Sequence, residues 1–306
     1  MGSILHQLNK TIAVVVAFNP GGGFRERVLR TLDEFGAVVI VDNGSAEAGR
    51  RVIAPLAEVA HVSVIVNAAN MGLGCALNQG VRFALSEGFE WICTLDQDSM
   101  MQPGFKRAME AVHGRLGARA ADVAFLAPVY QDERSGIRTS YATAPGPVPG
   151  CALVNETITS GNLVSAATFH AIGLFDDGLF IDYLDYDFSL RCRIQGRAIL
   201  EVQDAVLLHN LGNATPHRLL GRRFFVTHHS ALRRYYITRN RLTLYARYFA
   251  RTPAWVLKDG ARCLLDLFKV VFYETDRPAK LGSMIQGTLH ALTGKRGARP
   301  QGRKSQ

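Results

Sequence analysis

The sequence predicts an α/β protein built on a mainly parallel central sheet. Three features predict it: short runs that are almost continuously apolar and rich in β-branched residues, segments of helical spacing between them, and polar or turn-forming residues after each run. Strands buried on both faces give such apolar runs. Regular alternation of strands and helices is typical of a parallel sheet with helices on its faces.

Five segments of the first half are expected to be strands, and a helix is expected over residues 73–85, where apolar side chains recur at helical spacing. The expected strands are residues 11–18, 37–42, 61–67, 91–96 and 123–130. A Pro- and Gly-rich stretch at 143–150 marks a break, after which the pattern loosens.

In the second half, we expect a helix that begins near Asp185 and ends before Gly196, then an apolar strand that leads to His209. From about residue 230 the chain is expected to be helical. Two apolar stripes, around residues 261–272 and 281–292, are interpreted as packing faces rather than membrane or cofactor elements. These patterns predict a domain over 1–230, a helical region over 231–294 for membrane or oligomer contacts, and a basic, disordered tail over 295–306.

The composition is that of a globular protein, with 48% hydrophobic and 20% charged residues in 306. No apolar run is long enough for a transmembrane helix and the first residues do not resemble a secretory signal, so we expect a cytoplasmic protein. Five scattered cysteines without a CxxC indicate neither a disulfide framework nor a zinc site. The net charge of +9 is concentrated late in the chain: residues 205–258 hold ten Lys and Arg and no acid. Such a section faces nucleic acid, anionic lipid or phosphorylated substrates, or is a solvated helix face.

The expected strands end in polar or turn-forming residues, at the edge where parallel sheets bind ligands. Taken singly, each of these loops is equally consistent with an ordinary turn. A dinucleotide fold is disfavoured because Gly21–Gly23 is a glycine triplet and not GxGxxG, although Asp42 does end the second strand. Hydride chemistry is therefore not expected.

Asp96 and Asp98 follow the fourth strand. In a chain that is still extended, residues two apart point the same way, so both carboxylates would face one spot. Neighbouring carboxylates repel unless a cation lies between them, and Mg²⁺ or Mn²⁺ suits such oxygen ligands and often accompanies a phosphate substrate. A nucleotide diphosphate is the simplest such partner; the alternative is that one Asp only caps a turn.

Asp182, Asp185 and Asp187 lie close together at the predicted helix start, where acids can be caps. Three acids exceed what capping needs, so one is a candidate general base. A lone strand-end histidine such as His209 is commonly structural, but imidazole is also compatible with Mn²⁺ beside a carboxylate.

The ordered motifs resemble the inverting glycosyltransferase family 2, and most closely its bacterial rhamnosyltransferase branch. The resemblance covers residues 11–245 and rests on AFNP, VDNGS, NMGLGCALNQG, LDQDS, TSGNLVS, DYDFSLR and LLHNLG. It implies a GT-A fold, with a Rossmann-like mainly parallel sheet flanked by helices and a C-terminal helical extension.

The resemblance also implies roles for individual residues. Asp185 would be the catalytic base, although Leu184 replaces the family's usual Glu, which leaves Asp182 as the reserve base. Asp98 and His209 would bind Mg²⁺ or Mn²⁺. The nucleotide would be bound by Phe18, Asn19, Pro20, Asp42, Asn70, Gly72, Asp96 and Gln97. The sugar or acceptor would be bound by Gly161, Asn162, Asp182 and Arg191.

The implied activity is metal-dependent transfer of a sugar to a hydroxyl of a glycan or lipid-linked glycan acceptor in cell-surface polysaccharide synthesis. The favoured donor is dTDP-L-rhamnose, and a UDP-sugar is the alternative. The basic, aromatic segment 218–251 is expected to dock on anionic lipid or a diphosphate-lipid head at the inner membrane face. A second copy of the chain, in a homo-oligomer, is a further candidate partner. Two other functions are alternatives: a degenerate, non-catalytic glycan binder and a nucleic-acid-binding protein. The second would leave the polar strand ends unexplained, so no nucleic-acid partner is expected.

Overall fold

Residues 10–133, 136–209, 215–219 and 222–300 are described by the computed structural model of the protein, with the backbone alone described at His209, Leu219, Arg222 and Arg223. The chain forms two compact units. The first holds the residues up to Asp177 together with Leu184–Asn210, and the second holds Gly178–Tyr183 together with the chain from Leu211 on. The predicted boundary at residue 230 differs from this division, because the segment after Asn210 belongs to the second unit.

The first unit is built on a mixed sheet of eleven strands among the described residues. Nine of them follow in the order β3-β2-β1-β4-β10-β6-β11-β9-β8, and in addition β5 pairs with β11 and β7 pairs with β6. Its longest strands pair in parallel, β1 with β2 and β4, β2 with β3, and β6 with β11. The strands are β1 (Thr11–Ala17), β2 (Val38–Asp42), β3 (Val62–Val66), β4 (Trp91–Asp96), β5 (Met100–Met101), β6 (Val123–Asp132), β7 (Arg138–Thr139), β8 (Ala142–Pro145), β9 (Cys151–Val154), β10 (Leu163–Ser165) and β11 (Ala198–His209).

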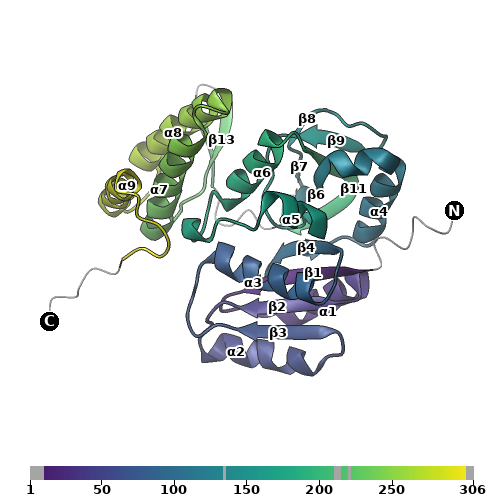
Figure 1. Ribbon diagram of the computed structural model, residues 1–306. Coiled ribbons are helices and arrows are strands. Elements are labelled where there is room, and N and C mark those ends of the chain that lie inside the picture. The colour runs from purple at the N-terminus through teal and green to yellow at the C-terminus, as the bar shows by residue number, and fades with distance from the viewer. Residues whose placement is uncertain (1–9, 134–135, 210–214, 220–221, 301–306) are drawn as a thin grey trace. The chain divides into compact units, whose positions relative to one another are not determined.

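All five predicted strands are present, and the apolar run before His209 forms β11. Every residue of β1 and β2 is buried, as the apolar runs predict for strands covered on both faces. Figure 1 shows α1, α2 and α3 against β1 to β4. The helices of this unit are α1 (Phe24–Phe35), α2 (Glu47–Ile53), α3 (Leu73–Ser86), α4 (Phe105–Leu116), α5 (Ala166–Ile172) and α6 (Leu184–Ile194).

Helix α3 approaches the sheet closely because of a glycine. A Cβ at Gly80 would lie 2.3 Å from Cγ1 of Val14 on β1, far inside van der Waals contact. The small residue therefore lets the backbone of α3 lie on β1. This contact helps fix the helix that follows the NMGLG loop.

The stretch 143–150, which was expected to mark a break, is instead part of the first unit. Residues 142–145 form β8, which pairs antiparallel with β9. Pro and Gly here make a hairpin connection in the sheet rather than a linker between domains. The stretch therefore interrupts the alternation of strands and helices within one unit, where Pro and Gly are common turn residues.

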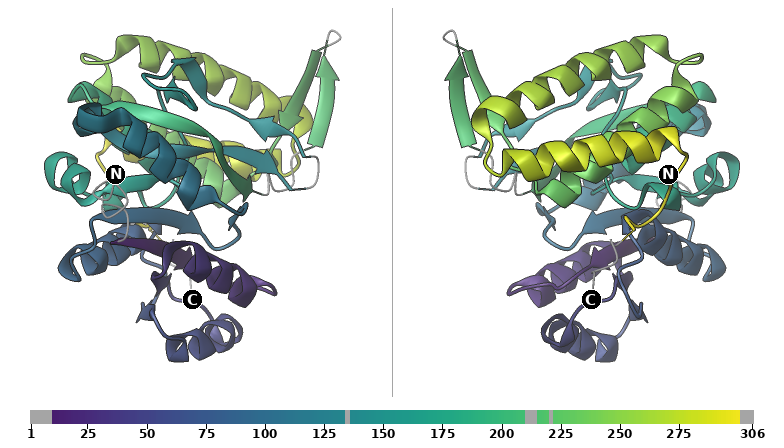
Figure 2. Two further views of the ribbon diagram at one scale, coloured as in Figure 1. Left: turned by 90° about the vertical axis from the view of Figure 1, so that its right-hand side faces the viewer. Right: turned by 90° about the vertical axis from the view of Figure 1, so that its left-hand side faces the viewer.

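The second unit contains α7 (Ala231–Tyr248), α8 (Pro253–Tyr273), α9 (Arg277–Leu292) and the hairpin of β12 (Thr215–Leu219) and β13 (Arg222–Val226). Figure 2 shows the long helices α8 and α9 beside each other and the hairpin at one end of them. The hairpin packs on the end of α8, where the rings of Phe224 and His217 each lie 5.0 Å from that of Tyr273.

The interior of the second unit is unusually polar. Arg234, Arg239 and Arg241 of α7 are all buried, and Arg234 and Lys280 both pair with the buried carboxylate of Glu274. The basic, aromatic segment 218–251 was expected to offer its cations to an anionic surface. That expectation is wrong for the centre of α7, because its arginines and Tyr235 turn inward.

Two further expectations about the C-terminal region need correction. Residues 295–300 of the basic tail are ordered against this unit: the Gly297 N–H donates to the Gly178 carbonyl at 2.7 Å, and the Arg299 N–H to the Tyr236 hydroxyl at 2.7 Å. Residues 301–306 lie outside the described chain. The apolar stripes of α8 and α9 are not packing faces within the chain, because Leu264, Leu265 and Ile285 are exposed. Among the described residues, none of the helices has both the length and the hydropathy for a membrane span.

Candidate active site

Polar loops follow the parallel strands β1, β2, β3 and β4 at one edge of the sheet. Hydrogen bonds tie these loops to one another. The Phe18 N–H donates to Oε1 of Gln97 at 2.8 Å, which joins the loop after β1 to the turn after β4. The Asn19 N–H donates to Oγ of Ser45 at 2.8 Å, and Asn19 Oδ1 accepts the Ala46 N–H at 2.7 Å. The sequence order of these motifs therefore corresponds to one connected rim.

The AFNP loop leaves its aromatic side chain outside the core. Phe18 is exposed, Pro20 is buried, and Asn19 adopts a left-handed backbone with φ of 50°. Asn is one of the few side chains that tolerate this region. The exposed Phe18 ring is chemically suited to stack on a nucleobase, and its contact with the nucleotide stays a prediction.

Asp42 is buried at the end of β2. Its Oδ1 accepts the Ser45 N–H at 2.9 Å, and its Oδ2 accepts no hydrogen bond from the residues that the structure describes. The bond to Ser45 fixes the orientation of the carboxylate. An oriented carboxylate with an unused oxygen is the acceptor that the ring N–H of a pyrimidine base requires.

Asn43 is a residue of this rim that the sequence reasoning did not single out. Its Nδ2 donates to Oδ1 of Asn70 and to the Gly72 carbonyl, both at 3.2 Å, and its Oδ1 accepts the Met71 N–H at 2.9 Å. Asn70 Oδ1 also accepts the Gly72 N–H at 2.9 Å. Asn43 thus holds the NMG loop that carries the predicted residues Asn70 and Gly72. The available signal was its place directly after Asp42 in VDNGS.

The turn after β4 carries Asp96 and Asp98, and it is not extended. The Ser99 N–H donates to the Asp96 carbonyl at 3.2 Å, which closes a tight turn through Gln97 and Asp98. The prediction that an extended strand aligns the two carboxylates was therefore wrong in its geometry. The turn still keeps both carboxylates in one four-residue loop, and Asp98 is exposed without a hydrogen bond or ion pair to any described residue.

The TSGN segment, residues 159–162, forms hydrogen bonds with this turn. Oγ of Ser160 accepts the Asp96 N–H at 3.0 Å and lies 2.8 Å from Oγ of Ser99. The Gly161 N–H donates to the Thr94 carbonyl at 2.6 Å. Ser160 was not a predicted site residue, since nothing in its own neighbourhood of the sequence points to a contact 64 positions away.

The buried hydroxyl of Tyr130 holds the same segment. It donates to the Ser160 carbonyl at 2.9 Å and lies 3.0 Å from Oγ1 of Thr157. Burial raises the pKa of Tyr130 well above its ordinary value, and the charges of Asp96 and Asp185 raise it further. The hydroxyl therefore stays protonated.

Gly161 and Asn162 occupy a tightly packed part of this segment. Gly161 has φ of 86°, and a Cβ there would lie 2.6 Å from Cγ of Pro128, so only glycine fits. Asn162 is buried and its Nδ2 donates to the Ile158 carbonyl at 2.9 Å. Its Oδ1 is buried and receives no hydrogen bond within the described chain. Contact of this pair with sugar or acceptor stays a prediction.

His209 is the last residue of β11. Leu207 pairs with Met101 and Leu208 with Met100, so the backbone of His209 follows β11 toward the chain that comes directly after Asp98. The side chain of His209 lies outside the description. Among the side chains that are described, no group of three or more His, Cys, Asp or Glu residues gathers closely enough to hold a metal.

The donor set around Asp98 nevertheless fits a hard divalent cation. Asp98 offers an exposed carboxylate, and the strand pairing directs the backbone of a potential imidazole ligand to the same turn. Oxygen ligands with one imidazole suit Mg²⁺ and Mn²⁺. Binding of the ion by Asp98 and His209 stays a prediction.

The two acids at the start of α6 differ in burial and in their partners. Asp187 is fully buried and its Oδ2 accepts from Nε of Arg191 at 2.9 Å, while Arg191 also donates to the carbonyls of Ile172 at 2.8 Å and Leu174 at 2.7 Å. This pair ties α6 to the end of α5. Asp185 is half-buried in the first turn, and its Oδ1 accepts the Tyr186 N–H at 2.9 Å. Of the two, Asp185 is the one suited to chemistry, and a sugar contact of Arg191 stays a prediction.

Asp182 belongs to the second unit and pairs with Arg233, whose Nη2 lies 2.9 Å from Oδ1 of Asp182. Asp182 and its neighbours Phe180 and Tyr183 have left-handed backbones, with φ between 62° and 68°. Nδ2 of Asn240 lies 2.8 to 2.9 Å from the carbonyls of Leu179, Ile181 and Asp182. The ion pair engages the Asp182 carboxylate, and the role of Asp182 as the reserve base stays a prediction.

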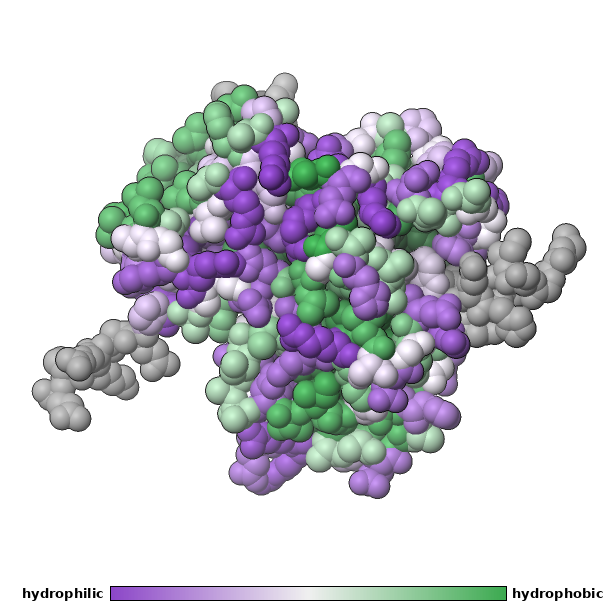
Figure 3. All heavy atoms as spheres, in the orientation of Figure 1, coloured by the Kyte–Doolittle hydropathy of each residue, from purple (hydrophilic) through white to green (hydrophobic). Residues whose placement is uncertain are grey.

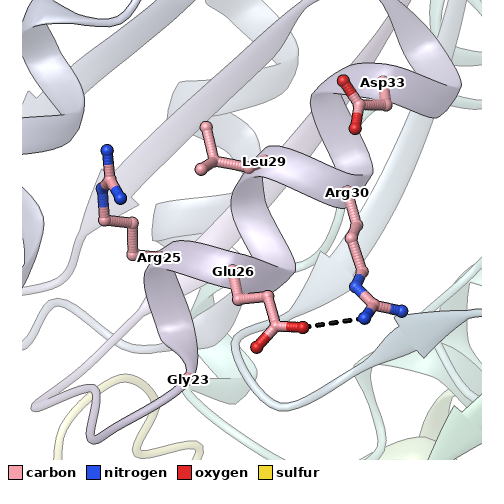
Figure 4. A pocket seen from close by; sticks show the side chains of 6 residues that line it. All are labelled: Gly23, Arg25, Glu26, Leu29, Arg30 and Asp33. Carbon is pink, nitrogen blue, oxygen red and sulfur yellow. Dashed lines mark hydrogen bonds and ion pairs between the residues drawn. The ribbon is translucent and has the colours of Figure 1, made fainter.

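A shallow depression of about 450 Å³ lies apart from these residues, on the outer face of α1. Figure 4 shows its lining, Gly23, Arg25, Glu26, Leu29, Arg30 and Asp33, all along one side of the helix. Glu26 and Arg30 form an i,i+4 ion pair at 2.8 Å. Two of its four charges pair with each other and all of its lining comes from a single helix, so we interpret the depression as a solvated helix surface rather than a binding site.

The segment that carries most of these loops matches a known protein family. Residues 13–157 match the model of Glycosyl transferase family 2. The chain carries a glycosyltransferase family 2 domain. Over 268 residues this glycosyltransferase is 29% identical to the dTDP-rhamnosyl transferase RfbF of Shigella flexneri, an alignment that covers 85% of this chain and 84% of RfbF. The chain is thus similar to this rhamnosyl transferase along most of both chains.

Solved structures of other glycosyltransferases share the fold. The mannosyltransferase PcManGT of Pyrobaculum calidifontis, in complex with GDP-Man and Mn²⁺, aligns with a TM-score of 0.56 at 13% identity and covers 94% of this chain and 88% of that one. GalNAc-T7 with UDP, GalNAc and Mn²⁺ aligns with a TM-score of 0.53 at 16% identity over 69% of this chain, which spans 44% of that one. The fold of this glycosyltransferase is therefore GT-A, as the sequence motifs predicted.

Proposed function

We propose that the enzyme transfers L-rhamnose from dTDP-L-rhamnose to a hydroxyl of a glycan or lipid-linked glycan acceptor. The observation that carries this donor is the similarity to the rhamnosyl transferase RfbF along most of both chains. The site is consistent with it, since Asp42 and Phe18 offer an oriented carboxylate and an exposed ring for a pyrimidine base. The same two contacts would serve a UDP-sugar, which is the alternative donor.

The chemistry assigned to the rim is a single displacement. The acceptor hydroxyl attacks the anomeric carbon opposite the departing nucleoside diphosphate and inverts the configuration there. Asp185 accepts the proton of that hydroxyl as the new bond forms. Asp98 and His209 would hold Mg²⁺ or Mn²⁺, whose charge neutralises that of the departing diphosphate. The Mn²⁺ in the two solved relatives supports a divalent ion without choosing between the two.

A donor panel tests the proposal. The protein is incubated with Mn²⁺ and dTDP-rhamnose, UDP-glucose, UDP-N-acetylglucosamine or GDP-mannose, and released nucleotide diphosphate is measured. Release that is confined to dTDP-rhamnose and lost in Asp185→Asn is the expected result. Preferential release of UDP would establish the alternative donor. The transferase assignment fails if calorimetry also detects no metal-dependent binding of dTDP or UDP.

A further inference from the structure

Helix α8 presents its apolar residues to solvent. Leu257, Leu264, Leu265 and Phe272 are 69%, 71%, 60% and 61% exposed. With Ala261 and Phe268 they recur at three- and four-residue spacing, which places them on one face of the helix. Figure 3 shows hydrophobic side chains gathered over the part of the surface that α8 and α9 occupy in Figure 1.

The acids of α8 turn inward instead. Asp259 is 1% exposed, and its Oδ2 accepts from Nε of Arg241 at 3.0 Å and from the hydroxyls of Tyr245 at 2.8 Å and Tyr183 at 3.0 Å. Asp266 accepts from Nη2 of Arg241 at 2.9 Å. A helix on the surface of a soluble protein normally does the reverse, with its apolar stripe toward the core.

Helix α9 has the same inverted arrangement. Ile285, Leu289 and Leu292 are 63%, 56% and 78% exposed, whereas Lys280 and His290 are buried. Nζ of Lys280 lies 2.8 Å from the Glu274 carboxylate, and Nδ1 of His290 lies 2.7 Å from the Tyr235 hydroxyl. The inverted orientation is therefore fixed by buried polar bonds in both helices and does not result from loose packing.

The charges that flank the apolar face of α8 are of one sign. Lys258, Arg262 and Lys269 lie along one flank of the apolar face of α8, and both acids of the helix pair with Arg241. Of the two charged residues of α9, Lys280 is buried and Arg277 is exposed in the first turn, and Asp276 lies in the turn between the helices. A second copy of this face would thus bring apolar groups and more cations, but no acids to neutralise them. A bilayer with anionic lipids offers both an apolar layer and a negative surface.

We propose that the outward faces of α8 and α9, defined by Leu257, Leu264, Leu265, Phe272, Ile285 and Leu289, bind the surface of a membrane that contains anionic lipid. The apolar side chains enter the boundary between headgroups and acyl chains, and Lys258 and Lys269 reach the lipid phosphates. The helices lie on the membrane and do not cross it. This inference does not depend on the identity of the donor sugar.

Vesicle flotation with the whole protein tests the apolar part. Vesicles of phosphatidylcholine alone are compared with vesicles of equal parts phosphatidylcholine and phosphatidylglycerol. The wild type is expected to float with the mixed vesicles, and less so at high salt. Leu264→Glu should weaken this partition about tenfold, since a Leu side chain no longer leaves water and a like charge faces the lipid. Ile137→Glu, at a residue that is 59% exposed in the first unit, is the matched control and should float as the wild type does.

A second pair of variants tests the cationic part. Lys258→Gln with Lys269→Gln should lower the partition onto anionic vesicles by about thirtyfold, at about 1 kcal/mol for each of the two cations near the surface. Arg82→Gln with Arg107→Gln removes the same net charge from exposed positions of the first unit and should leave it unchanged. Circular dichroism confirms that each variant keeps its helix content.

Three results would overturn the proposal. The wild type could fail to float with the mixed vesicles. Leu264→Glu could float as well as the wild type, which would locate membrane attachment elsewhere. Light scattering could show a dimer that Leu264→Glu converts to a monomer, without vesicle binding by either protein, which would make a second copy the occupant of the face.

Discussion

The hydroxyl of Ser160 accepts the backbone N–H of Asp96 at 3.0 Å and lies 2.8 Å from the hydroxyl of Ser99. One side chain thus holds both ends of the turn that carries Asp96 and Asp98. The proposed donor site would depend on this contact because a flexible turn would present the two carboxylates in many arrangements, and a bound cation would have to order them.

Ser160→Ala should therefore weaken Mn²⁺-dependent binding of dTDP more than it weakens the fold. Loss of a neutral hydrogen bond costs about 1 kcal/mol of unfolding free energy. Calorimetry of dTDP at several Mn²⁺ concentrations measures the effect, which we expect to be a several-fold rise in the apparent Kd. Ser86→Ala, which removes a hydroxyl bonded to the Phe83 carbonyl at an exposed helix end, is the control. Equal metal dependence in the two variants would contradict this role of Ser160.

Asp98→Asn should remove metal-dependent nucleotide binding and leave the thermal midpoint unchanged. The carboxylate is exposed and bonds to no described residue, so the fold does not use it. An amide keeps the size of the side chain but loses the charge that a divalent ion requires. Calorimetry with and without Mn²⁺, beside a thermal melt, measures both quantities. Persistent metal-dependent binding of dTDP would show that other ligands hold the ion.

Asp187→Asn is expected to behave in the opposite way. Removing the fully buried carboxylate of Asp187 leaves the partly buried cation of Arg191 without its counter-charge, and loss of one partner of a buried ion pair typically costs about 3–5 kcal/mol of unfolding free energy. Urea denaturation measures this loss. Asp98→Asn and Asp187→Asn each replace one carboxylate by an amide. Together they distinguish the acid that is expected to bind the metal from the acid that stabilises the fold. A stable Asp187→Asn protein without activity would instead indicate a catalytic role.

The strands were predictable because their chemistry is local. An apolar, β-branched run specifies a buried strand whatever surrounds it, and the polar residues after Ala17, Asp42 and Asp96 lie at one edge once the strands are parallel. Ser160 and Tyr130 were not predictable, because their contacts with the Asp96 turn join segments that only the folded sheet brings together.

The orientation of α8 shows a second limit. Helical spacing shows that the helix has an apolar and a polar face, but it does not determine which face is inside. Arg241 decides that, because a buried guanidinium requires the carboxylates of Asp259 and Asp266, which lie 18 and 25 residues away. The rule that apolar faces pack inward therefore gave the wrong answer.

The stability of the protein should fall as the pH drops through the range where His229 titrates. Burial, aided by the positive charges of Arg233 and Arg234, lowers the pKa of His229 from 6.5 to about 4. Between these values the unfolded chain binds the proton and the folded chain does not, so protonation favours unfolding. Urea midpoints at pH 7.5, 6.0 and 5.0 should decline for the wild type and decline less for His229→Gln. His170→Gln, at an exposed position in the first unit, should follow the wild type.

Asp185→Asn should lower kcat by about 10² to 10⁴ while leaving the binding of dTDP unchanged, because a general base acts on the acceptor hydroxyl and not on the nucleotide. Its place in the first turn of α6 keeps the carboxylate oriented through the Tyr186 N–H, a bond that the amide oxygen of Asn can also accept. Steady-state nucleotide release and calorimetry give the two quantities. Asp182→Asn is the comparison, since that carboxylate is engaged by Arg233. If Asp182→Asn loses the greater share of kcat, the base is Asp182.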